Sequence, residues 1–244
     1  TAKIPQDYDY EKLTDLDSNY LKGKRVGVLN SSESSEIEKE LIEKVKKVLE
    51  ARGAVIVDVE FNISSDYKAA KEFYVLLYEF NVGMKNYLKG RDLPYETLED
   101  IVAFNEANSD TVLKYFGQEI FLESLKATDT ERYLKEREDI GRLAKAQIDS
   151  VLKVNNLDVI IGLTRNPGWL TDLENGDSRG DGGISWANGG LSAVAGYPHI
   201  TIPLDFVNDL PVGVSFLGTA WDEANLINAA YSFEQENKFF PIPK

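Results

Sequence analysis

His199 is the only histidine in the chain, so a hydrolase built on a Ser-His-Asp triad would have to use it as its base. The sequence contains no GxSxG motif, the turn that commonly carries the serine of such a triad. His199 also begins an apolar run that ends at Leu204, a pattern typical of a β-strand. We therefore expect a structural role for His199, and an independent hydrolase that uses it is the least favoured of three hypotheses.

The Ser-x-x-Lys spacing, which activates a serine nucleophile in penicillin-binding enzymes, occurs twice in the chain. The two pairs are Ser65 with Lys68 and Ser150 with Lys153. The SDN and KTG motifs that accompany this spacing in those enzymes are absent, so we interpret both pairs as coincidence. The chain also has no cysteine, which excludes thiolate nucleophiles, disulfides and thiolate metal sites.

Four acidic residues of one irregular stretch could suggest a calcium site: Asp172, Glu174, Asp177 and Asp181. Gly176 stands where the EF-hand pattern has a ligand, so the spacing favours solvated side chains over a metal. The turn after the first predicted strand has neither GxGxxG nor GxxxxGK[ST], so nucleotide binding is not expected. We predict no metal and no cofactor.

Composition narrows the class of partner. The 244 residues have 43% hydrophobic content, which is enough for a globular core. The net charge of −14 repels phosphate backbones, so no nucleic acid is expected as a partner. No apolar run approaches the roughly 20 residues that span a bilayer, so no membrane is expected either, and we predict a cytoplasmic protein.

The elements that would position a site begin with a strand, a helix and a second strand. The strand covers residues 24–29, and the helix runs from a capping box of Ser35 and Glu38 to about Arg52. The second strand covers 54–59, and the succession predicts a parallel βαβ unit. Helices follow over 66–89, from Thr97, over 118–126 and over 130–155.

A continuous apolar run, residues 158–163, predicts a strand buried on both faces. The irregular stretch 164–185 follows it, and α/β folds place binding sites after the carboxyl ends of such strands. Next come a helix of small residues that ends at Gly196, two strands over 199–204 and 212–217, and a last helix over 221–235. We expect Pro203 and Pro211 to lie at the ends of their strands.

Two stretches, AGYPHITIP and LPVGVSFLGTAWDEANLINAAYSFEQ, resemble the C-terminal end of amidase signature enzymes of the peptide-amidase type. The resemblance implies an α/β fold with a mixed β-sheet flanked by α-helices. It also implies amide hydrolysis by a nucleophilic serine, a bridging serine and a lysine. Those residues lie in the family's N-terminal half, around a Gly/Ser-rich signature that this sequence lacks. We therefore expect the C-terminal part of an amidase, inactive alone.

The resemblance further implies which residues form the wall of the substrate pocket. These are Thr164, Asn166, Pro167, Trp169, Asp177, Ser185, Trp186, Asn188, Gly196 and Tyr197. The implied partners are an amide substrate and the N-terminal half of the same enzyme, and an exposed apolar face would allow homo-oligomers. We predict a connecting arm over 1–23 and a single α/β domain over 24–244. The alternative is a non-catalytic α/β module that binds a small molecule at 164–185 or has a regulatory role.

Overall fold

The computed structural model describes residues 3–30, 34–61, 71–165, 167–168, 170–174 and 189–240. The chain divides into two compact units. The first contains Thr1–Ile63, Gly141–Gly168 and Asp181–Lys244, and the second contains Ser64–Ile140 and Trp169–Gly180. The predicted arm and single α/β domain stay a prediction, because compact units are not the same as folding domains.

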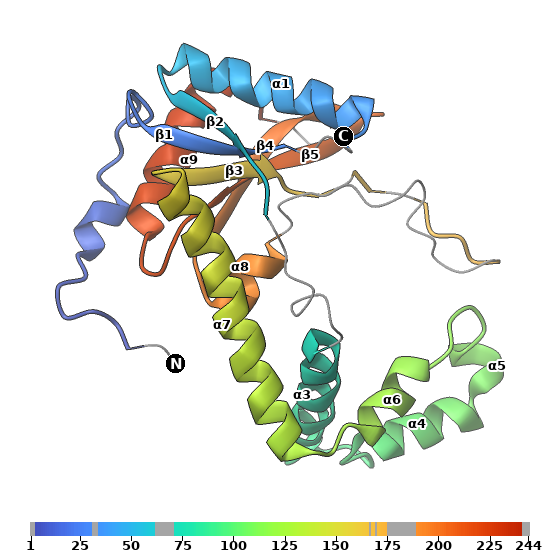
Figure 1. Ribbon diagram of the computed structural model, residues 1–244. Helices are drawn as coiled ribbons and strands as arrows, with labels where there is room; N and C mark the ends of the chain where they lie inside the picture. The colour runs from blue at the N-terminus through green and yellow to red at the C-terminus, as the bar shows by residue number, and fades with distance from the viewer. Residues whose placement is uncertain are drawn as a thin grey trace. The chain divides into compact units, whose positions relative to one another are not determined.

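The first unit holds a five-stranded mixed sheet in the order β2-β1-β3-β5-β4 (Figure 1). Its strands are β1 (Arg25–Leu29), β2 (Val55–Val59), β3 (Val159–Leu163), β4 (His199–Val207) and β5 (Leu210–Leu217). Strand β1 is parallel to β2 and β3, whereas β5 is antiparallel to β3 and β4. The predicted α/β class with a mixed sheet is therefore confirmed.

Helix α1 (Glu36–Ala51) connects β1 to β2 and completes the predicted parallel βαβ unit. Its capping box is present as predicted, because Ser35 Oγ accepts a hydrogen bond from the Glu38 backbone N–H while the Glu38 carboxylate accepts one from the Ser35 N–H. This reciprocal pair satisfies two of the helix's unpaired donors. The helix places Leu41, Val45 and Leu49 in the core.

One face of the sheet is a conventional apolar core. All five residues of β3 are buried, as the continuous apolar run predicted. Ile161 lies opposite Phe216 of β5, and both belong to a buried cluster with side chains of α1 and of α9 (Glu223–Asn237). The rings of Phe216 and Phe233 meet edge to face at 5.7 Å. This face holds the first unit together.

The other face of the sheet carries both large and small side chains. Strand register places Ile160 and Leu217 on it, and toward the carboxyl end of β3 it places Gly162, Ser215 and Thr201 there. Helix α8 (Gly190–Ala195) and the C-terminal part of α7 (Thr130–Val154) lie on the side of the sheet away from α1 (Figure 1).

The β4–β5 hairpin is longer than predicted. Its loop has two residues, Asn208 and Asp209, with φ of 50° and 62°. Two central residues with positive φ match the twist of antiparallel strands, so pairing continues to the loop. The prediction that both prolines lie at strand ends is wrong for Pro203, which lies in the middle of β4, whereas Pro211 is the second residue of β5. Strand β4 has a register shift between Pro203 and Asp205 and an open edge, and such places tolerate proline.

The N-terminal segment is attached to α9. Leu21 is fully buried in the core cluster, and the preceding residues follow one side of the helix. The Asp17 N–H donates to Asn228 Oδ1 at 2.8 Å, and the Ser232 hydroxyl donates to the Ser18 carbonyl at 2.7 Å. These bonds make the segment part of the first unit. We call this contact the arm seam.

The second unit is helical. It contains α3 (Lys71–Leu88), α4 (Leu98–Ala107), α5 (Ser109–Val112), α6 (Glu119–Lys126) and the N-terminal part of α7. The predicted start of α4 is confirmed by a capping box between Thr97 and Asp100. Tyr78 of α3 stacks on Tyr133 of α7 with ring centres 4.2 Å apart. No helix among the described residues is long and apolar enough to cross a bilayer.

Candidate functional site

Thr164 extends the ladder of β3 by one residue. Its backbone N–H donates to the Gly213 carbonyl of β5 at 2.9 Å. Because β3 is a buried central strand, this bond fixes the position of Thr164 at the carboxyl end of the strand, where its side chain is half-buried. In open α/β sheets this end of a parallel strand is the usual place for a binding site.

Thr164 belongs to a cluster of three hydroxyl groups. Its Oγ1 lies 2.8 Å from Ser215 Oγ, and Ser215 Oγ lies 3.1 Å from Thr201 Oγ1. Ser215 is fully buried, Thr164 is half-buried and Thr201 is exposed. The cluster therefore runs across three neighbouring strands from the interior to the surface. We call it the hydroxyl cluster.

Glycine makes this arrangement possible. Thr201 lies directly opposite Ser215 in the register, whereas Thr164 reaches the serine diagonally, over Gly213. A Cβ atom at Gly213 would lie 2.8 Å from Thr201 Cγ2 and 2.9 Å from Thr164 Oγ1. Such contacts are too short for real side chains, so the absence of a side chain at Gly213 lets the two threonines converge on Ser215.

The turn between α8 and β4 lies at the other end of the sheet. Gly196 ends α8 in the left-handed region with φ of 68°, and the Tyr197 hydroxyl donates to Asp149 Oδ2 of α7 at 2.9 Å. Burial, together with this bond, raises the pKa of the Tyr197 phenol. Thr164 is level with Pro203, six residues after Tyr197, which corresponds to roughly 20 Å along a strand.

Of the ten residues predicted to line a pocket, the structure describes four. Thr164 lies in the hydroxyl cluster, and Pro167 is half-buried three residues beyond it. Gly196 and Tyr197 lie near Asp149, so the described residues do not form one group. The other six, Asn166, Trp169, Asp177, Ser185, Trp186 and Asn188, lie outside the described residues. The role of all ten stays a prediction.

Sequence reasoning missed Ser215, Thr201 and Gly213. The signal was present in the two strands, because apolar residues alternate there with small or hydroxyl-bearing ones. Alternation with period two separates the two faces of a strand. Interpreting HITIP and PVGVSF in this way would have placed all three residues on the face away from the core.

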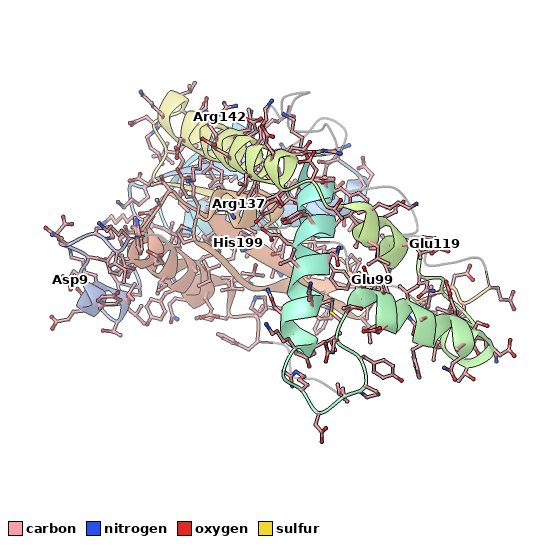
Figure 2. The ribbon with its side chains drawn as sticks, turned by 90° about the horizontal axis from the view of Figure 1, so that it is seen from below. Asp9, Glu99, Glu119, Arg137, Arg142 and His199 are labelled. Atoms are coloured by element: carbon pink, nitrogen blue, oxygen red, sulfur yellow. The ribbon has the colours of Figure 1, made fainter. Side chains whose placement is uncertain are left out.

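The Ser-x-x-Lys pairs and His199, for which the sequence predicted no catalytic role, do not form a site within the part of the chain that the structure describes. Ser150 and Lys153 are both exposed on α7, and no hydrogen bond joins them. Ser65 and Lys68 lie outside the described residues. His199 begins β4 (Figure 2), and a Cβ atom at Gly189 would lie 3.4 Å from its ring. His199 therefore packs over the N-terminal cap of α8, and its structural role stays a prediction.

A second polar cluster surrounds a cavity of about 630 Å³ near the amino ends of β1 and β3. Lys24 pairs with Asp158 at 3.2 Å, and the Asp158 carboxylate also accepts the Arg25 N–H. The Asn225 amide donates to the Asp158 carbonyl and to Asp222 Oδ2, both at 2.8 Å. The polar groups of this cluster bond mainly to one another and to the backbone, which indicates a structural role.

The chain is similar to amidases and to amidotransferase subunits among known proteins. The family model described as Amidase matches residues 2–227. A probable amidase of Arabidopsis thaliana is 27% identical over 94% of this chain and 41% of its own length. A glutamyl-tRNA(Gln) amidotransferase subunit of Exiguobacterium sibiricum is 30% identical over 86% of this chain and 44% of its own length.

Solved structures agree with these relatives. The peptide amidase PAM, in complex with the competitive inhibitor chymostatin, superposes with a TM-score of 0.84 at 36% identity, over 98% of this chain and 48% of that chain. Native peptide amidase from Stenotrophomonas maltophilia superposes with a TM-score of 0.83 at 34% identity, over the same shares of the two chains. The chain thus spans less than half the length of each of these relatives. The family model matches more than nine-tenths of the residues of this chain, so the chain belongs to the amidase family.

Proposed function

We propose that this chain is the C-terminal part of an enzyme that hydrolyses linear amides. In this proposal it supplies strands of the sheet and part of the wall of the substrate pocket. The catalytic Ser-Ser-Lys set lies in an N-terminal half outside these residues. The observation that carries the proposal is the coverage, because nearly all of this chain aligns with less than half of a peptide amidase.

The hydroxyl cluster supports the position of the pocket wall. It lies at the carboxyl end of a central strand, and Thr201 and Pro203 next to it are exposed. Buried hydroxyls beside an exposed one are suited to contact a polar substrate or the polar groups around it. The remaining predicted wall residues belong to the same proposal, including the six outside the described part of the chain.

Ammonia release from a panel of aliphatic, aromatic and peptide amides tests the proposal. The chain is assayed alone, the product of the upstream part of its own gene is assayed alone, and the two are then mixed. We expect activity only in the mixture, because removing the nucleophile and its base costs many orders of magnitude in rate. Activity of this chain alone would contradict the proposal. Binding of a small molecule with no activity in any mixture would support the non-catalytic module instead.

We further infer that the isolated chain self-associates through apolar surface. Phe206, Leu210 and Phe240 are exposed near the end of the β4–β5 hairpin, with exposed fractions of 45%, 41% and 62%. Exposed apolar groups of this kind mark interaction surfaces. Sedimentation velocity at several concentrations measures the oligomeric state. A monomer at all concentrations would contradict the inference, whereas dimers that dissociate on addition of the upstream half would support it.

A further inference from the structure

The hydroxyl cluster has more hydroxyl protons than hydrogen bonds among its own members. Its three hydroxyl groups carry three protons but make only two mutual contacts, at 2.8 Å and 3.1 Å. Ser215 is fully buried and has no other hydrogen-bond partner within the described residues. A buried hydroxyl that leaves its proton unpaired costs about 1–3 kcal/mol, so Ser215 donates to one of the two threonines.

Because Ser215 has a single proton, the two ends of the cluster, Thr164 and Thr201, take opposite roles. The threonine that accepts from Ser215 keeps its own proton and can donate it to a ligand. The other threonine donates to Ser215 and offers lone pairs outward, because a hydroxyl has one donor and two acceptor sites. If Ser215 turns, both ends exchange roles together. The cluster therefore always presents a donor at one end, whereas the other end acts only as an acceptor.

We propose that Ser215 is a positioning residue that couples Thr164 and Thr201, so that the cluster binds an amide group of the substrate through both its C=O and its N–H. A primary amide carries its carbonyl acceptor and one N–H donor on the same side, which matches the two ends of the cluster. Both threonines lie within 3.1 Å of the same serine oxygen, so one amide group can reach both. The inference rests on the proposed function.

The accessibility of the three side chains agrees with this division of roles. Thr201 is exposed and Thr164 is half-buried, so a ligand can approach both ends, whereas Ser215 is reached only through them. The backbone bond from Thr164 to Gly213 and the pairing of Thr201 with Ser215 fix both threonines to the sheet. Groups held by rigid strands lose little freedom when they bind.

An ester analogue separates this role from a merely structural one. An ester has the carbonyl acceptor but no N–H, so it uses only the donor end of the cluster. Wild type, Ser215→Ala and Ser232→Ala are compared in the mixture with the upstream half, on an amide and on the ester of the same acyl group. Ser232 is a matched control, because it is another fully buried serine whose hydroxyl bonds to the arm.

We expect Ser215→Ala to raise KM for the amide about three- to tenfold, the effect of one hydrogen bond, with a smaller change for the ester and for kcat. Ser232→Ala leaves the ratio of amide to ester KM unchanged. Equal changes for amide and ester in Ser215→Ala would overturn the inference. A wild-type mixture that hydrolyses no amide would instead overturn the proposed function, and the inference with it.

Substitutions at the exposed end keep the test valid if Ser215→Ala does not fold. Thr201→Val removes the hydroxyl and keeps the shape, whereas Thr201→Ser keeps the hydroxyl and loses a methyl group. The inference expects an amide-selective rise in KM for Thr201→Val and restoration in Thr201→Ser. If Thr201→Val and Thr201→Ser behave alike, the hydroxyl at this end does not contact the substrate, and the inference fails.

Discussion

The arm seam and the hydroxyl cluster are polar regions of the first unit, each with at least one buried side chain, but their hydrogen bonds are completed differently. In the arm seam, Asn228 accepts from the Asp17 N–H and donates to the Ala224 carbonyl, while Ser232 donates to Ser18 and accepts from Leu21. In the hydroxyl cluster, three hydroxyls bond only to one another within the described residues. The seam needs no ligand, whereas the cluster retains a donor for one.

Counting donors and acceptors distinguishes polar groups that serve the fold from polar groups that bind a ligand. Buried polar groups are nearly always paired, so a cluster that is completed by backbone partners is explained by folding alone. A cluster with one proton left over, placed at the carboxyl end of a central strand, is explained better by what binds there. Amide recognition should therefore respond to changes in the cluster and not to changes in the seam.

The largest expected effect comes from Gly213→Ala. The added Cβ would lie 2.8 Å and 2.9 Å from Thr201 and Thr164, so both threonines have to move away from Ser215. A displacement of about 1 Å in a binding group can cost on the order of 100-fold in rate, and we expect a loss of this size in amide hydrolysis by the mixture. Gly83→Ala is the control, since a Cβ there meets nothing within 4 Å.

A Gly213→Ala variant with unchanged kinetics would remove the main support for a functional cluster. It would mean that the threonines shift without consequence and that the cluster is another structural polar region. The same variant should also lose about 1–3 kcal/mol of unfolding free energy, the usual cost of overpacking, so the rate and not the stability distinguishes it from a seam variant. Urea denaturation of the isolated chain measures this cost separately from the rate.

The seam should show the opposite behaviour. Asn228→Ala leaves the Asp17 N–H without its partner, so we expect about 1–3 kcal/mol lower unfolding free energy in urea denaturation. The ratio of amide to ester hydrolysis should not change. Tyr8→Phe is the matched control, because it removes a half-buried hydrogen bond from the same segment to Glu223 and leaves no buried N–H without a partner, so it should cost less than Asn228→Ala. A shift in the amide-to-ester ratio for Asn228→Ala would show that the seam is not purely structural.

Local patterns were sufficient to predict most elements of this fold. The capping box of Ser35, the helix start at Thr97 and the apolar runs of β1, β2 and β3 each depend on neighbours in the sequence, and each is confirmed. The hairpin was predicted too short, because prolines were interpreted as strand ends. In the structure an open edge and a bulge accommodate Pro203 within β4.

The hydroxyl cluster could not be predicted in the same way, because it depends on register between distant strands. Thr164 and Ser215 are 51 residues apart, and they meet because β3 pairs with β5 at one particular alignment. A shift by one residue would turn Ser215 into the apolar core. Thr164 was predicted from family resemblance and from its place after a buried strand, without its partners. Resemblance indicates which residue matters, whereas only register shows what holds it.

The smallest expected effect concerns Asp222, which belongs to the second polar cluster, around Asp158 and Asn225. Like the arm seam, this cluster has hydrogen bonds among its own groups and to the backbone, but unlike the seam it contains charged side chains. Burial raises the pKa of Asp222 above 3.8 and the nearby charge of Glu223 acts in the same direction, against the hydrogen bond from Asn225. A carboxyl whose pKa is raised by folding binds more protons in the folded state. Its contribution to stability is therefore present at low pH and is lost as the pH rises through the folded pKa.

Asp222→Asn should remove this loss, because asparagine carries no charge at any pH and still accepts from Asn225. The difference in unfolding free energy between variant and wild type should grow in favour of the variant as the pH rises above about 4, by less than about 1.4 kcal/mol for each pH step of one. Urea denaturation between pH 4 and 8 measures the difference, and Asp15→Asn, an exposed carboxylate, is the control. A difference that is constant with pH would mean that Asp222 titrates normally. Its cluster would then differ from the arm seam in charge but not in energetics.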